Sequence, residues 1–403
     1  SEIQEVSRSG VAVPGFRASG VRCGIKQRGL DLALVVSDVP AAAAGVFTRS
    51  SVVGAPVEIN RSRIRSGRGR AIVANSGCSN VAMGARGLRD AHRMGALAAR
   101  VLGCSEREVF IASTGVIGEP LPMDKLTKGV VRAGEALGRH GFADAAAAIM
   151  TTDTVPKLVA TRTRVAGRTV SVAGMAKGSG MIEPNMATLL AFLVTDAAVA
   201  PPYLRRLLRD LADESFNRVT VDGEGSTSDT ALLLANGVAG NPLLRANASP
   251  GAGAFAGALR EVCQELSRAI ARDGEGATKL VTVRVRGART RDEAMRAAKR
   301  IANSMLVKTA LFGGDANWGR ILQAVGAGEV RINLARAEVS LAGVRVFHAG
   351  SSAGPLARRR AQDRLRSKEV EVEVELASGH GEALVWTCDL SYDYVRINAE
   401  YRT

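Results

Sequence analysis

The chain has 403 residues, of which 46% are hydrophobic and 23% charged, and this length is enough for two or three domains with substantial cores. Its longest apolar stretch, residues 186–194, is far too short to cross a bilayer, and residues 1–8 lack the apolar segment of a signal peptide, so we expect a cytoplasmic protein. The formal net charge is +15, but the arginines are spread along the chain and form no long tail, and the cluster at residues 61–70 contains no aromatic residue, which argues against nucleic-acid binding.

The first part of the chain alternates short β-branched runs with Ala-rich amphipathic stretches, which predicts a mixture of strands and helices. The predicted strands are residues 32–36, 71–73 and 109–111, and the predicted helices are residues 85–102, 143–150, 204–216 and 255–272. Turn-like residues follow the second and third strands, at 75–77 and 113–115. The last helix is expected to end at a glycine C-cap, Gly274.

The C-terminal third is predicted to be rich in strands. Residues 241–253 are rich in Asn, Ala, Pro and Gly and form the best linker candidate. Beyond them, residues 282–286 alternate polar and apolar side chains, as residues 368–376 do. We expect the latter to pair with 383–390 as a hairpin across the glycine-containing turn at 378–381. Because regular βαβ units are absent from the pattern, it predicts an α+β sandwich.

Cysteine and histidine residues give no local pattern for a metal site, a disulfide framework or a Ser-His-Asp triad. They are dispersed without CxxC or CxxH spacing, at Cys23, Cys78, Cys104, Cys263 and Cys388 and at His92, His140, His348 and His380. An odd and scattered set of cysteines is typical of reduced thiols. We therefore expect no metal and no cofactor.

The segment from Lys177 to Phe192 carries the most chemical information. Two glycines and a proline precede Thr188, which opens an apolar run. A threonine hydroxyl is a poor nucleophile unless a base lies beside it, and cutting the bond between Ala187 and Thr188 frees an α-amine that can be that base. The segment is therefore a candidate self-cleaving N-terminal-nucleophile site. The alternative without chemistry is a loop that leads into a buried strand.

This segment resembles the signature of the ornithine acetyltransferase family, also called the bifunctional glutamate N-acetyltransferases of the cyclic arginine pathway. Further stretches resemble that family's motifs in the same order, at residues 112–118 (ASTGVIG), 151–157 (TTDTVPK), 215–223 (SFN with VDG), 273–279 (DGEGATK), 315–320 (DANWGR) and 397–403 (INAEYRT). The matches run from about Gly15 to the last residue, so the resemblance covers nearly the whole chain.

The resemblance implies a layered αββα sandwich as catalytic core, with smaller α+β domains after it. Cleavage would give an α chain of residues 1–187 and a β chain of residues 188–403. In the β chain the core would extend to about residue 240, followed by smaller domains at about 241–280 and 281–403. The resemblance also implies a heterotetramer of two α and two β chains from one precursor.

The resemblance further assigns roles to individual residues. Thr188 is the nucleophile, and Thr114 and Gly115 form the oxyanion hole. The residues that contact substrate are Thr154, Lys177, Thr188, Glu275, Asn398 and Thr403. Hydroxyl donors and the Lys177 ammonium suit an α-carboxylate, whereas the Glu275 carboxylate suits the distal ammonium of ornithine.

The implied reaction is a ping-pong transfer of acetyl from N-acetyl-L-ornithine to L-glutamate through an acyl-threonine, which needs no metal or organic cofactor. The alternative is a hydrolase, an aminopeptidase or amidohydrolase on the same self-cleaving scaffold; the DGEGATK and INAEYRT stretches favour the transferase. Departures from the family pattern at Cys78, at Glu224–Gly225 and at Met305 leave open the fine specificity, including the use of acetyl-CoA as a donor.

Overall fold

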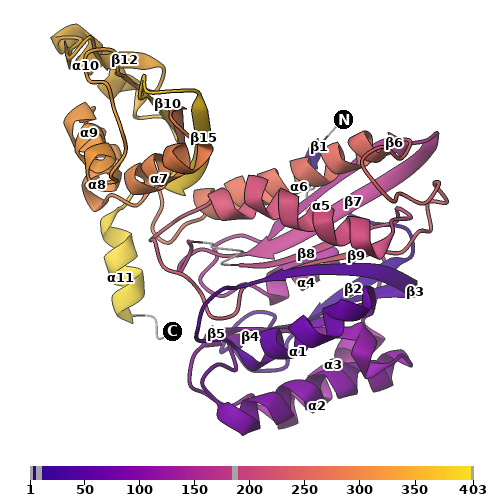
Figure 1. Cartoon of the computed structure of the whole chain (residues 1–403). Coiled ribbons are helices and arrows are strands. Elements are labelled where there is room, and N and C mark those ends of the chain that lie inside the picture. Colours follow the sequence, from indigo (N-terminus) through magenta and orange to yellow (C-terminus); the bar gives the residue numbers. More distant parts are fainter. Residues whose placement is uncertain (1–2, 6–10, 184–188, 401–403) are drawn as a thin grey trace.

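The computed structural model describes residues 3–5, 11–183 and 189–400 and contains two β-sheets, each with its own hydrophobic core (Figure 1). In this described part, the first sheet has nine strands in the order β1-β6-β7-β8-β9-β3-β4-β5, with β2 paired to β3. Its strands are β1 (Ile3–Glu5), β2 (Phe16–Val21), β3 (Leu32–Phe47), β4 (Arg68–Cys78), β5 (Val109–Val116), β6 (Lys157–Val165), β7 (Arg168–Lys177), β8 (Leu190–Thr195) and β9 (Thr230–Ala235).

The long strand β3 folds this sheet back over itself. Its first half pairs with β2 and β4, and its second half, from Ala42 to Phe47, pairs with β9. The pairing with β4 shifts register between Val36 and Ala41, around Pro40, which has no N–H to donate to the ladder. One apolar cluster therefore fills the space between the two halves, with Phe110 and Ile72 from one half and Phe192 and Leu232 from the other.

Helices cover the outer faces of both halves. The helices around this sheet are α1 (Ala55–Arg63), α2 (Gly84–Leu102), α3 (Met123–Glu135), α4 (Phe142–Ala148), α5 (Pro201–Glu214) and α6 (Ala252–Arg272). Helices α2 and α3 pack with β3, β4 and β5, whereas α5 and α6 pack on the half that contains β7 and β8 (Figure 1). The resulting layers, α–β–β–α, confirm the predicted sandwich.

The short helix α4 lies close to β2 because the sequence provides a glycine there. A Cβ on Gly20 would lie 2.0 Å from the backbone oxygen of Asp144, so no larger residue fits. Phe142 and Ala145 of α4 then join the apolar cluster between the two halves. A sequence with 4% aromatic residues thus fills its interior mainly by close approach of small side chains.

The second sheet, between residues 280 and 388, has six strands in the described chain, in the order β13-β12-β11-β14-β10-β15. Its strands are β10 (Leu280–Ala288), β11 (Glu338–Leu341), β12 (Val344–His348), β13 (Ser351–Ser352), β14 (Glu369–Glu375) and β15 (Gly381–Cys388). The helices of this part are α7 (Arg291–Ala302), α8 (Met305–Phe312), α9 (Trp318–Gly326), α10 (Pro355–Arg364) and α11 (Tyr392–Glu400). Helix α11 leaves this unit and extends back beside the first one (Figure 1).

The predicted hairpin in this sheet is wrong. Strand β10 lies between β14 and β15, since Leu280 pairs with Glu369 on one side and with Cys388 on the other. The reason is burial: Val281, Val283 and Val285 of β10 are fully buried, so β10 takes the central position with a partner on each edge. Proximity of two strands in sequence did not decide their pairing.

Two further expectations differ from the structure. The resemblance implies a smaller domain over about 241–280, whereas α6, which makes up most of these residues, packs on β6 and β7 in the core of the first sheet. The expected left-handed glycine cap at Gly274 is also absent, since α6 ends at Asp273 and the glycine with positive φ in this turn is Gly276 (φ +69°). Gly274 is needed for packing instead, because a Cβ there would lie 2.8 Å from Cys388 Sγ.

Among the described helices, none combines the length and the apolar character that a membrane crossing requires.

The folded sheet predicts that Phe110, fully buried between the two halves, carries a large share of the stability. Phe110→Ala should lower the free energy of unfolding by about 3–5 kcal/mol, because it leaves a cavity that the paired strands cannot close. Leu356→Ala on α10, where the side chain is 71% exposed, is the control and should change it by less than about 0.5 kcal/mol. Urea unfolding measures the free energy of unfolding of both variants. If Phe110→Ala lowered it as little as the control does, this would contradict the packing of Phe110 between the two halves.

Candidate active site

A pocket of about 330 Å³ lies where the end of β5, the end of β7 and the starts of β8 and β9 meet, with α11 beside it. It is lined by Ser79, Thr114, Gly115, Ile117, Thr151, Thr152, Lys177, Gly180, Met181, Ile182, Leu189, Leu190, Asp222, Glu224, Gly225, Ser226, Thr227, Ser228, Asp229, Glu275, Tyr394 and Asn398. Segments that are far apart in the sequence therefore form one cavity.

The pocket brings together most of the predicted site residues that the structure describes. Its lining includes Thr114, Gly115, Lys177, Glu275 and Asn398. The predicted cleavage site, Ala187 and Thr188, and the predicted contact Thr403 lie outside the described residues. Leu189, which directly follows Thr188 in the chain, lines the pocket.

Thr154 is not among the lining residues, in contrast to the prediction. Its side chain is exposed, and its hydroxyl and its backbone N–H both donate to the Asp273 carboxylate, the N–H at 3.0 Å. The carboxylate holds the threonine away from the cavity. Its neighbours Thr151 and Thr152 line the pocket instead.

Thr114 and Gly115 are fixed at the end of β5 by parallel pairing with β4, in which Ser76 lies opposite Thr114 and Gly77 opposite Gly115. Gly115 has a φ of +126°, and a Cβ there would lie 2.4 Å from the backbone carbon of Gly77. This position thus requires glycine both for its backbone conformation and for space.

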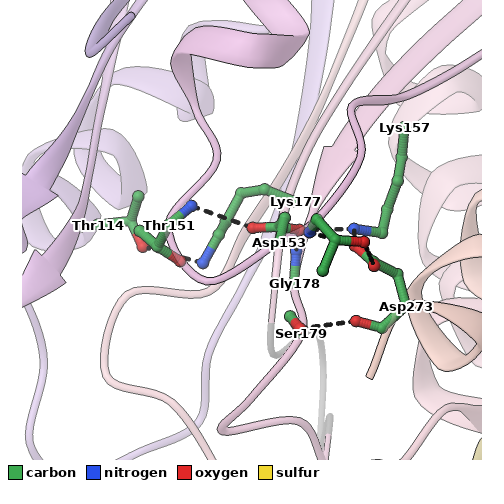
Figure 2. Close-up of polar contacts among 9 residues, drawn as sticks. Thr114, Thr151, Asp153, Lys157, Lys177, Gly178, Ser179 and Asp273 are labelled. Carbon is green, nitrogen blue, oxygen red and sulfur yellow. Dashed lines mark hydrogen bonds and ion pairs between the residues drawn. The ribbon is translucent and has the colours of Figure 1, made fainter. Parts of the chain in front are cut away.

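Lys177 is the buried cation of the pocket. Its ammonium donates to Thr114 Oγ1 at 3.4 Å, across the space between the two halves of the folded sheet (Figure 2). Burial lowers the pKa of Lys177, and the positive charge of Lys157 lowers it further, whereas the carboxylates of Asp153, Asp229 and Glu275 oppose this change. The charges of nearby carboxyl groups therefore favour the ammonium form in the place that water would otherwise take.

Behind Lys177 lies a buried ion cluster of Asp153, Lys157 and Asp273, which we call the Asp153 cluster (Figure 2). Lys157 Nζ lies 2.6 Å from an oxygen of each carboxylate. The Asp153 carboxylate also accepts the N–H of Gly178 at 2.8 Å and that of Thr151 at 3.0 Å. Burial alone would raise the pKa of Asp153, but the two lysines and these hydrogen bonds outweigh it and lower the pKa to about 2.

Glu275 and Asn398 form a second polar group in the pocket lining. Asn398 Nδ2 on α11 donates to Glu275 Oε2 at 2.7 Å, and the N–H of Glu275 donates to the backbone oxygen of Ser179 at 2.9 Å. A Cβ on Gly180 would lie 2.4 Å from the Glu275 carboxyl group, so glycine lets this carboxylate rest against the backbone. The carboxylate and the Lys177 ammonium together suit a small ligand with charges of both signs.

Sequence reasoning did not assign a role to Asp222 or to Tyr394, which also line the pocket. Asp222 accepts the N–H groups of Met181 at 2.7 Å and of Ile182 at 2.8 Å, and the hydroxyl of Tyr394 at 3.2 Å. Met181 has a φ of +55°, which a non-glycine residue rarely adopts, so these bonds hold a strained backbone. The VDG stretch was the available signal for Asp222, whereas Tyr394 lies before the INAEYRT stretch and outside every motif that was recognised.

A second carboxyl group that sequence reasoning missed is Asp229, which is 3% exposed and lines the pocket. Burial raises its pKa well above the ordinary value, although hydrogen bonds from the Ser226 and Thr48 hydroxyls and the charge of Lys177 act against this.

Over residues 3–5, 11–183 and 189–400, no group of three or more His, Cys, Asp or Glu side chains is placed to hold a metal ion.

Comparison with known proteins gives matches over nearly the full chain. The model of the ArgJ family matches residues 17–403. The arginine biosynthesis bifunctional protein ArgJ of Geobacter sulfurreducens is 52% identical over 392 residues, 97% of this chain and 100% of that protein. The protein of the same name from Geobacillus stearothermophilus is 45% identical, over 100% of this chain and 98% of that one.

A solved structure, described as ornithine acetyltransferase complexed with ornithine from Mycobacterium tuberculosis, is 42% identical to this chain. It covers 46% of this chain and 100% of its own, with a TM-score of 0.42.

The pKa of Asp153, about 2 against an ordinary value of 3.8, predicts a pH-dependent contribution to stability. A carboxyl group with a folded-state pKa below the unfolded one stabilises the fold above about pH 4, and this contribution is lost as the pH falls toward 2. The difference in unfolding free energy between wild type and Asp153→Asn should therefore narrow by about 1 kcal/mol between pH 7 and pH 3, measured by thermal unfolding, and the rest of the contribution is lost nearer pH 2.

Asp196→Asn is the matched control. Asp196 is also buried and accepts the N–H of Ser171 at 2.7 Å, but burial raises its pKa. Its ionised form costs stability at neutral pH, so wild type should gain stability relative to this variant as the pH falls, the opposite direction. If the difference in unfolding free energy between wild type and Asp153→Asn stayed constant down to pH 3, this would contradict the ionised state assigned to Asp153.

Proposed function

Since this chain belongs to the ArgJ family, we propose that it is an acetyltransferase of arginine biosynthesis that moves acetyl from N-acetyl-L-ornithine to L-glutamate through an N-terminal threonine. The observation that supports this most is the composition of the pocket. A hydroxyl and a glycine at Thr114–Gly115, a buried ammonium at Lys177 and the Glu275 carboxylate line one cavity next to Leu189, the residue that follows Thr188.

The first step of the proposal is self-cleavage between Ala187 and Thr188. The Thr188 hydroxyl loses its proton and attacks the Ala187 carbonyl carbon; the C–N bond then breaks, the nitrogen takes up a proton, and an ester remains. Water hydrolyses this ester, giving chains of residues 1–187 and 188–403.

Hydrogen bonds on both sides of the cleavage segment support this proposal. Upstream, Asp222 binds the N–H groups of Met181 and Ile182. Downstream, the backbone oxygen of Leu189 accepts the N–H of Thr230 at 2.9 Å. The chain is thus bound to the pocket wall on both sides of the proposed cleavage site, at Met181–Ile182 and at Leu189, and cleavage does not require either side to move.

In the cleaved enzyme the α-amine of Thr188, with an unperturbed pKa of about 7.7–8.0, takes the proton of its own hydroxyl. The oxygen attacks the acetyl carbonyl of N-acetylornithine, and the oxyanion is stabilised by the Thr114 hydroxyl and the Gly115 N–H. The C–N bond breaks and ornithine leaves as the protonated amine. The amine of glutamate then attacks the acetyl-threonine ester, which releases N-acetylglutamate and restores the threonine.

The charged lining suggests how each substrate is oriented. Lys177 binds the α-carboxylate, and Glu275 with Asn398 binds the distal ammonium of ornithine. Thr151 and Thr152 line the pocket where Thr154 was expected, so we assign the hydroxyl contacts to them. Thr403 is retained as a proposed contact at the chain end.

We also propose three further properties, of which the first two rest on family membership. Acetyl-CoA serves as a second acetyl donor, in keeping with the bifunctional names of the relatives. Two α and two β chains assemble into a heterotetramer. The cytoplasmic location is proposed from the sequence rather than from the family, since one relative of the same name is mitochondrial. Each chemical step uses side chains, the freed amine and water.

The proposal predicts that ornithine release depends on glutamate. Purified enzyme should convert N-acetylornithine and glutamate to ornithine and N-acetylglutamate, with parallel double-reciprocal plots typical of a ping-pong reaction, because the acetyl-threonine waits for an amine. Chromatographic quantification of all four amino acids measures this. Ornithine release at the same rate without glutamate, with acetate as product, would instead identify a hydrolase.

The oxyanion role predicts the effect of Thr114→Val, which removes the hydroxyl but keeps the branched shape. We expect kcat to fall by about 10²–10³-fold with little change in KM, because the lost donor acts mainly in the transition state. Thr127→Val on α3, whose hydroxyl donates to the backbone oxygen of Met123 at 2.8 Å outside the pocket, is the control. Retention of kcat within about twofold by Thr114→Val would remove Thr114 from the mechanism.

A further inference from the structure

The Asp153 cluster lies behind the pocket, and none of its three charged side chains is among the lining residues. Even so, each chain segment that it joins supplies residues to the lining. We propose that the Asp153 cluster is the positioning device of the active site, which holds Lys177 and Glu275 in place without touching substrate. This inference rests on the proposed function, because it assigns a role relative to the proposed substrate-binding side chains.

The hydrogen bonds of the cluster join three segments. Asp153 accepts the N–H of Gly178, next to Lys177, and the N–H of Thr151, which lines the pocket. Asp273 binds the same lysine as Asp153, and its backbone oxygen accepts the Ser179 hydroxyl at 2.6 Å. The backbone oxygen of Ser179 in turn accepts the N–H of Glu275. A displacement of the cluster therefore moves the backbone at both Lys177 and Glu275.

Burial makes this arrangement stiff. The side-chain exposures are 0% for Asp153, 1% for Lys157 and 8% for Asp273, so no partner can be exchanged for water. Two carboxylates share one lysine, so the cluster has one excess negative charge. The buried Lys177 supplies the compensating positive charge. Removal of any one charge leaves another buried without its partner, which is costly in a protein interior.

The charges that face Lys177 have known signs. The carboxyl groups of Asp153, Asp229 and Glu275 favour its ammonium form, whereas the charges of Lys157 and Lys26 oppose it. Removing Asp153 should therefore make deprotonation of Lys177 easier, and removing the charge of Lys157 should make it harder. Two substitutions within one cluster should thus act on Lys177 in opposite directions, which a general loss of structure does not do.

The experiment measures kcat/KM for N-acetylornithine against pH in the processed wild type, in Asp153→Asn and in Lys157→Gln. The alkaline limb, where Lys177 loses its proton, should move to lower pH by about one unit in Asp153→Asn and to higher pH in Lys157→Gln. The proposal would be overturned if the alkaline limb moved in the same direction in both variants. It would also be overturned if both variants were folded and their alkaline limbs coincided with that of the wild type.

Asp196→Asn is the control, because it removes a buried carboxyl group of the same sheet that does not line the pocket; its alkaline limb should stay in place. Should Asp153→Asn not fold, Asp273→Asn takes its place. It should raise KM for N-acetylornithine at least about fivefold, because Ser179 and Glu275 lose their support, and an unchanged KM would overturn the proposal. Failure of the proposed function can be distinguished from failure of this inference, because in that case the wild type itself would show no glutamate-dependent acetyl transfer.

Discussion

The active site depends on one constraint, the folding of a single sheet back over itself along β3. Strand β3 pairs with β4 in one half and with β9 in the other, so the ends of β5 and β7 come to lie at the same cavity. The contact between the Lys177 ammonium and the Thr114 hydroxyl, 3.4 Å long, exists only because the two halves face each other. An open sheet of the same strands would leave these residues far apart.

The charges of the site follow from the same geometry. Strand ends in the middle of a four-layer sandwich are remote from water, so each charge there needs a partner within the protein. The chain meets this requirement with alternating ions: Asp273, Lys157, Asp153 and then Lys177, which alone of these lines the pocket. Glycines at positions 115 and 180 allow the backbone to approach the same space, since a Cβ at either would collide with a neighbouring group.

Local sequence patterns predicted three strands and four helices of the first sheet and its surroundings, and the family resemblance implied the layered sandwich and five residues of the pocket. They failed where the outcome depended on contacts between distant segments. The hairpin between β14 and β15 was predicted from proximity, but the fully buried valines of β10 placed that strand between them. Thr154 was expected at the substrate, but Asp273, more than a hundred residues away, binds its hydroxyl and N–H. No local pattern contains the information that these two segments meet.

The central claim is that Thr188 becomes reactive because cleavage frees its own amine. Intact-mass analysis of freshly purified wild type and of Thr188→Ala tests it most directly. The account predicts two chains, residues 1–187 and 188–403, for the wild type and one uncut chain of 403 residues for the variant. Cleavage of Thr188→Ala at the same bond, or an uncut wild type that still transfers acetyl, would contradict it.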